Sequence, residues 1–267
     1  MKGIALAGAV LAATAFPGGT GAADTPQAED IMKSAHMNLY YPGDDGRAFV
    51  RMTMTDKRGK TREREFVMVR RDLEDGGAQK YFVYFLKPAD VRRTAFMVWK
   101  DPQKDDSRWI YVPAIDLVKR ISAKDKGSSF VGSDFSYEDV SGRHWTDDDH
   151  AITGEEEIDG TACWIVESTP RGKDSFSRKV SWVSKEDAIA VREEYYDRKD
   201  RRVRVLTAGE IRVVDGHRTV TKRTARNEKK NHTTTVEFFD IAYDLGVDEK
   251  VFTERYLKNP PGDLVSR

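Results

Sequence analysis

The segment that decides the fold is WIYVPAIDLVKRISAKDKGSSFVGSDFSYEDV, residues 109–140. It begins with a strand-like run, residues 109–112, that stops at Pro113, and a second run follows at 117–121. Residues 128–139, SSFVGSDFSYED, then hold three aromatic side chains and three carboxylates. Exposed apolar surface costs about 25 cal/mol per Å². The loop therefore either packs against a sheet or borders a site that an apolar ligand occupies.

Most of the chain is predicted to form strands. Alternating or apolar runs recur over residues 48–243, and polar turns such as Asp159-Gly160 separate them. Roughly a dozen such strands predict a mainly β fold with a single curved antiparallel sheet. One amphipathic helix is expected to precede the strands, with Thr25 as its capping residue, and a short helix is expected at 248–257.

The N-terminus has the pattern of a secretory signal peptide. Lys2 precedes an uncharged apolar run at residues 4–16, and the small residues 21–23 follow. The alternative, a membrane anchor, is disfavoured because a spanning helix needs about 20 apolar residues. We expect residues 1–23 to be cleaved and residues 24–267 to form a single exported domain.

Charge and cysteine content narrow the function classes. The 45 basic and 45 acidic residues balance, so the chain has no general electrostatic attraction for nucleic acid. Cys163 is the single cysteine, which excludes an internal disulfide, and its strand-like neighbours predict a buried side chain. The five histidines lack zinc-site spacing. Residues 147–150, DDDH, are predicted to form a solvated turn instead of a metal site.

The carboxylates of the loop allow two interpretations. Asp134, Glu138 and Asp139 could supply paired carboxylates for the acid–base chemistry of a hydrolase, but aspartate, serine and glutamate are also ordinary loop residues. We favour the second interpretation. It predicts that Phe130 and Phe135 pack inward, and that Asp134 and Glu138 accept hydrogen bonds from backbone N–H groups of the loop.

The predicted strands carry many aromatic side chains. One sheet with few helices cannot easily cover so much apolar surface. The aromatic side chains either fill the core or line a residual cavity, and such a cavity in an exported protein suits an acyl chain. The candidate cavity-lining, lipid-binding residues are Phe82, Tyr84, Phe96, Trp99, Trp109, Tyr111, Trp164 and Trp182.

Three segments carry a resemblance to a known family. They are FLKPADVRRTAFMVWK at residues 85–100, the run 105–140 that contains the opening segment, and CWIVESTP at residues 163–170. Together they resemble the outer-membrane lipoprotein-sorting-like proteins of the LolA/LolB superfamily. The family loop residues are Phe130, Gly132, Ser133, Asp134, Phe135, Tyr137, Glu138 and Asp139.

The resemblance implies an unclosed half-barrel with a few lid helices on its concave side. It also implies a periplasmic, non-enzymatic carrier without a cofactor, which binds the acyl chain of a lipid or lipoprotein. The implied partner is an inner-membrane transporter of the RND (MMPL-type) or ABC class, with the outer membrane as the destination. A different function stays open at this point, that of a periplasmic adaptor subunit of such an exporter that carries no lipid.

Overall fold

The computed structural model describes residues 26–266. The predicted signal peptide, residues 1–23, and the predicted cap Thr25 lie outside the described residues. The first helix, α1 (Ala28–Tyr40), matches the predicted amphipathic helix and buries Ile31 and Met32 on its apolar face. The other helices are α2 (Tyr137–Ser141), α3 (Glu254–Lys258) and α4 (Gly262–Val265).

Within residues 26–266, thirteen strands form one antiparallel sheet in the order β6-β5-β4-β3-β2-β1-β15-β14-β11-β10-β9-β8-β7. The edge strands β6 and β7 do not pair with each other, so this sheet is not closed into a barrel. One half contains β1 (Asp45–Thr55), β2 (Thr61–Asp72), β3 (Gln79–Lys87), β4 (Ala95–Lys100), β5 (Ser107–Val112) and β6 (Leu117–Ile121). The other contains β7 (Asp148–Ile158), β8 (Thr161–Pro170), β9 (Arg178–Ser184), β10 (Ala190–Tyr196), β11 (Arg202–Ala208), β14 (Lys222–Asn227) and β15 (His232–Tyr243).

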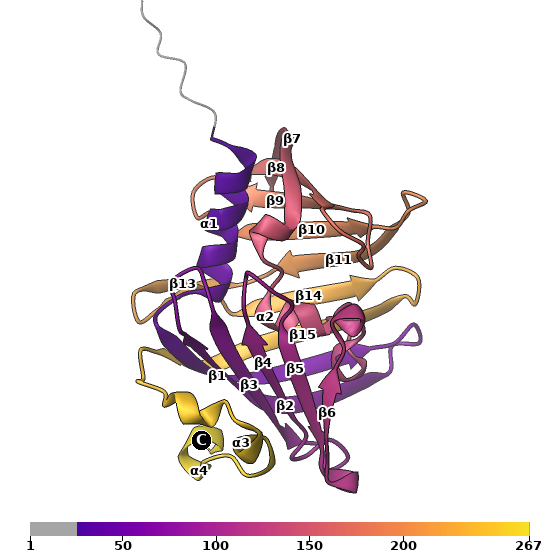
Figure 1. Ribbon diagram of the computed structural model, residues 1–267. Helices are drawn as coiled ribbons and strands as arrows, with labels where there is room; N and C mark the ends of the chain where they lie inside the picture. The colour runs from indigo at the N-terminus through magenta and orange to yellow at the C-terminus, as the bar shows by residue number, and fades with distance from the viewer. Residues whose placement is uncertain (1–25, 267) are drawn as a thin grey trace, which may run out of the picture.

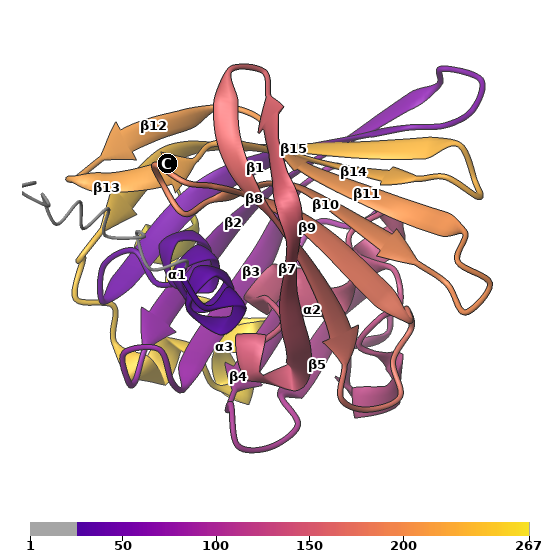
Figure 2. The ribbon, with the colours of Figure 1, turned by 90° about the horizontal axis from the view of Figure 1, so that it is seen from above.

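A separate hairpin, β12 (Ile211–Val214) and β13 (His217–Val220), leaves the main sheet between β11 and β14. The sequence predicted one continuous strand over residues 203–211. Instead β11 ends at Ala208, and the N–H of Gly209 bonds to the carbonyl of Lys222 where the hairpin begins. Strand β13 contacts α1, so the hairpin and the helix are neighbours at the rim of the sheet (Figure 2).

The curved sheet encloses α1 and α2 on its concave side, whereas α3 and α4 lie outside it (Figures 1 and 2). The C-terminal segment packs Val251, Phe252 and Leu257 against the convex face of β2 to β5. The first helix thus has the position expected of a lid. The short helix predicted at 248–257 forms as a 3-10 turn and α3, and it covers the opposite face of the sheet.

Candidate functional site

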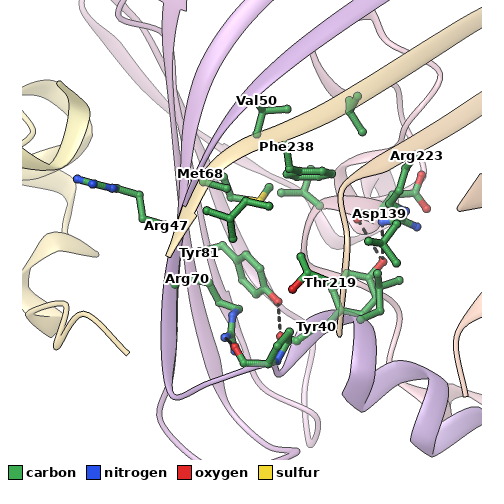
Figure 3. Close-up of a pocket in the computed structure, with 18 of the residues that line it drawn as sticks. Tyr40, Arg47, Val50, Met68, Arg70, Tyr81, Asp139, Thr219, Arg223 and Phe238 are labelled. Atoms are coloured by element: carbon green, nitrogen blue, oxygen red, sulfur yellow. Dashed lines mark hydrogen bonds between the residues drawn. The ribbon is translucent and has the colours of Figure 1, made fainter. Parts of the chain in front are cut away.

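An apolar cavity of about 150 Å³ lies on the concave face, between the sheet, α1 and the 128–139 loop. Its floor comes from β1, β2 and β15, its roof from the end of α1, and one side from β13 (Figure 3). The apolar lining residues are Leu39, Pro42, Ala48, Val50, Met52, Phe66, Met68, Phe130, Phe135, Val140, Val220, Val236, Phe238 and Ile241.

The size of this cavity limits what it holds in this conformation. An engineered apolar cavity of about the same volume accepts a benzene-sized ligand. The space therefore admits a short alkyl segment, and a complete acyl chain exceeds it.

A polar link joins the two elements that cover the cavity. The side-chain amide of Asn38, near the end of α1, donates to the carbonyl of Asp187 over 2.8 Å. Arg218 of β13 donates to the carboxylate of the same aspartate, also over 2.8 Å. Because Asp187 lies between β9 and β10, it ties both α1 and the hairpin to the sheet.

Two arginines at the rim of the cavity, Arg70 and Arg47, form hydrogen bonds with other parts of the chain. Arg70 of β2 donates to the carbonyl of Gly43 over 2.9 Å and pairs with Asp72, which fixes the chain just after α1. Arg47 points away from the cavity in Figure 3 and donates to the carbonyl of Asp263 in α4 over 3.0 Å. The donors of Arg70 thus serve Asp72 and backbone carbonyls, whereas Arg47 is directed to the C-terminal segment.

The two phenylalanines of the 128–139 loop pack inward, as predicted. Phe130 and Phe135 are only 2% and 6% exposed and belong to the concave core. The Phe130 ring lies 5.3 Å from Phe96 and 5.9 Å from Phe85, centroid to centroid. Gly132 has a φ of +80°, which permits the tight turn between the two rings.

The predicted roles of the loop carboxylates are wrong in detail. Asp134 accepts from the side chains of Thr234 over 2.7 Å and His232 over 2.5 Å, and Glu138 accepts from Lys126 over 2.7 Å. Both therefore accept hydrogen bonds from side chains instead of loop N–H groups.

The residue that caps the loop backbone is Asp139. The Ser136 hydroxyl accepts from the Asp139 N–H, and the Asp139 carboxylate accepts from the Ser136 N–H, which starts α2 with a capping box. Each of the three carboxylates thus has a structural partner, which agrees with the interpretation that the sequence favoured.

The eight predicted cavity aromatics do not meet at one place. Phe82 and Tyr111 belong to the convex-face cluster, Tyr84 and Trp109 pack against it, and Trp99 donates to the carbonyl of Phe252 there. None of the eight, all within the described part of the chain, lines the cavity above. The other three are Phe96 in the concave core, Trp164 beside α1, and Trp182, which donates to Glu156.

Strand geometry explains the difference. Successive side chains of a strand point to opposite faces, so Tyr81 and Val83 of β3 belong to the concave core, whereas Phe82 belongs to the convex cluster. Because the C-terminal segment covers the convex face, both sets are apolar, and the sequence shows no alternation that marks the inner set. The contribution of the eight aromatics to ligand binding remains a prediction.

Other predicted features have clear positions. Cys163 is fully buried, as expected. Residues 147–150 do not form a solvated turn throughout, because Asp148 is buried and pairs with Arg143 over 2.7 Å. No group of histidine, cysteine and carboxylate side chains in residues 26–266 has a metal-binding arrangement.

Buried basic groups lie beneath α1. His36 of α1 is 3.4 Å from the Lys100 ammonium, and its ring lies 5.5 Å from that of His144. Burial and the positive charge of Lys100 depress the pKa of His36 well below its usual value, and the same causes lower that of His144 to about 4. Burial also lowers the pKa of Lys100 to about 8.

We expect stability to fall on acidification, because these histidines stay neutral in the folded state. The unfolded state takes up a proton at each below its ordinary pKa of about 6.5, so each contributes a loss of about 1.4 kcal/mol at pH 5.5. His36 and His144 together lower the free energy of unfolding by about 3 kcal/mol between pH 7.5 and 5.5, measured by urea denaturation. The variant His144→Gln should lose about half of this dependence. Equal stability of the wild type at both pH values would contradict the assignment.

The architecture is that of the LolA-like half-barrels. An outer membrane lipoprotein-sorting protein domain from Vibrio parahaemolyticus matches with a TM-score of 0.80 and 24% identity, covering 86% of this chain and 98% of that one. A LolA superfamily protein from Nitrosomonas europaea matches with a TM-score of 0.68 and 16% identity, covering 87% and 100%. At these identities the two likenesses establish the fold.

The family follows from a nearer relative. A DUF1329 family protein from Desulfovibrio piger is 31% identical, with a TM-score of 0.79 over 85% of this chain and 97% of that one. A family model described as an uncharacterized protein matches residues 77–259. The chain belongs to the DUF1329 family, within the LolA-like fold. No curated protein sequence matches it, and no helix in residues 26–266 has the length and apolar composition needed to cross a membrane.

Proposed function

We propose that the protein is a periplasmic carrier that binds an acyl chain of a lipid or lipoprotein in the concave cavity. It passes this cargo between an inner-membrane transporter of the RND (MMPL-type) or ABC class and the outer membrane. The observation that carries the proposal is the apolar cavity under α1 and the β12–β13 hairpin. The LolA-like fold and the name of the Vibrio relative support the same class of function.

The energetics fit such a role. Each CH₂ group that leaves water for an apolar site gains about 0.8 kcal/mol, so a chain of ordinary length repays the opening of the lid. The link through Asn38, Asp187 and Arg218 consists of a few hydrogen bonds at the rim. It can break while the sheet stays intact. Transfer then requires only that donor, carrier and acceptor differ modestly in affinity.

The variant Ala48→Trp tests the cavity. Ala48 lines the floor of the cavity, and an indole there fills space that a ligand would occupy. We expect the affinity for a fluorescent fatty acid, followed by titration at equilibrium, to fall by about tenfold or more. Ala162→Trp is the matched control, because Ala162 is exposed on β8 and should leave binding unchanged.

Two outcomes would contradict the carrier function. Undiminished binding to folded Ala48→Trp would show that the ligand occupies another place. If the wild type binds no fatty acid at all, the adaptor function, in which the protein carries no lipid, takes precedence.

A further inference from the structure

An arginine without a carboxylate partner lies where the apolar cavity meets a smaller and more polar one. Arg223 of β14 lines both the cavity of about 150 Å³ and a second cavity of about 50 Å³ beneath α1. Figure 3 shows its side chain beside Asp139 and Tyr40, at the end of the apolar space. A cation in this position faces whatever enters the cavity.

The guanidinium of Arg223 has few partners of its own. Its hydrogen bond goes to the Tyr40 hydroxyl over a long 3.4 Å, and no carboxylate oxygen of residues 26–266 lies within 4.0 Å of it. The rings of Tyr40 and Phe135 each lie 5.9 Å away, centroid to guanidinium carbon. Since a guanidinium carries five N–H donors, most of its hydrogen-bonding capacity is unused by these residues.

The nearest carboxylates are already taken by other cations. Asp139 pairs with Arg204 over 2.6 Å, and Glu193 pairs with Lys179 over 2.8 Å. Both carboxylates act on Arg223 only from beyond ion-pair distance, and their negative charges help to raise its pKa. An anionic group of a ligand can therefore pair with the free N–H donors of Arg223 without breaking either of these ion pairs.

We propose that Arg223 binds the acidic headgroup, a carboxylate or a phosphate, of an amphiphile whose alkyl chain lies in the apolar cavity. The proposal rests on the carrier function and specifies its cargo. Guanidinium groups bind both headgroups with paired N–H donors, and such charge-assisted bonds are stronger than neutral ones. Arg70 cannot replace Arg223, because Asp72 and backbone carbonyls already occupy its donors, and Arg47 points away from the cavity toward α4.

The test compares three ligands with the same alkyl chain: dodecanoate, dodecyl phosphate and dodecan-1-ol. Their affinities for the wild type are measured at pH 8 by isothermal titration calorimetry. All three require the same opening of the lid, so its cost cancels in the ratios. A charge-assisted hydrogen bond predicts that at least one acidic ligand binds about tenfold more tightly than the alcohol. The ratio between the two acidic ligands separates a carboxylate cargo from a phosphate cargo.

Variants locate the effect. Arg223→Gln should bring the affinity of the acidic ligand to that of dodecan-1-ol, whereas Arg223→Lys should retain part of the preference. Arg226→Gln is the matched control, because Arg226 lies on the same strand with an exposed side chain, and the preference should persist.

The possible failures are distinct. Equal wild-type affinity for all three ligands overturns the headgroup proposal and leaves the carrier function standing. Failure to bind any of them overturns the carrier function as well. If Arg223→Gln does not fold, the wild-type ratios and Arg223→Lys still decide. The headgroup would belong to another site if Arg223→Lys leaves the preference for both acidic ligands unchanged while Arg226→Gln abolishes it.

Discussion

Replacing Phe130 by alanine should lower the free energy of unfolding by about 3–5 kcal/mol. The ring is almost fully buried and contacts Phe66, Phe85, Phe96 and Tyr137 in the concave core. Its removal leaves a cavity that these rings cannot fill without moving the strands that carry them. Urea denaturation followed by circular dichroism measures the change.

The control for Phe130→Ala is Leu73→Ala. Leu73 is 46% exposed, so its truncation should change stability by less than about 0.5 kcal/mol. A loss below about 1 kcal/mol for Phe130→Ala would show that the 128–139 loop is not a structural anchor of the sheet.

The second large effect is expected for Asp139→Asn, which should cost about 3–5 kcal/mol of stability. The carboxylate pairs with Arg204 over 2.6 Å and also accepts the Ser136 N–H that starts α2. An amide in its place leaves Arg204 without its counter-charge, beside the already unpaired Arg223. Thermal and urea unfolding measure the loss.

Two further variants interpret the Asp139→Asn result. Asp200→Asn removes an exposed carboxylate from its pair with Arg178, and this surface change should have no measurable effect on stability. Arg204→Met added to Asp139→Asn should recover part of the loss, because the unpaired cation is removed. If the double variant Asp139→Asn/Arg204→Met loses as much unfolding free energy as the two single variants together, the result would argue against the pairing of Asp139 with Arg204.

The curved sheet and its first helix were predictable because their signals are local. Polar turns at Asp159-Gly160 and Asp215-Gly216 separate neighbouring strands, and helical spacing of apolar residues marks α1. The inward positions of Phe130 and Phe135 followed from the cost of exposing aromatic rings in a loop. These inferences need no knowledge of which segments meet in space.

The cavity could not be predicted because its residues depend on long-range pairing. Strand β1 pairs with β15 across most of the sequence, and this pairing brings Ala48 and Phe238 to one surface. The aromatics chosen from the sequence were on suitable strands, yet five of them face the C-terminal segment on the convex side. Nor does the sequence show that Arg223 lacks a carboxylate partner, since Asp139 and Arg204 are 65 residues apart.

The central claim, that this cavity carries an acyl chain, is tested most directly by the mass of the native protein. The protein is expressed in its own cells, purified without detergent and measured by native mass spectrometry, followed by extraction of any bound lipid. We predict a population heavier than the polypeptide by one alkyl-chain amphiphile, which the solvent extract releases. A protein that has only its polypeptide mass, and that takes up no added fatty acid, would contradict the account.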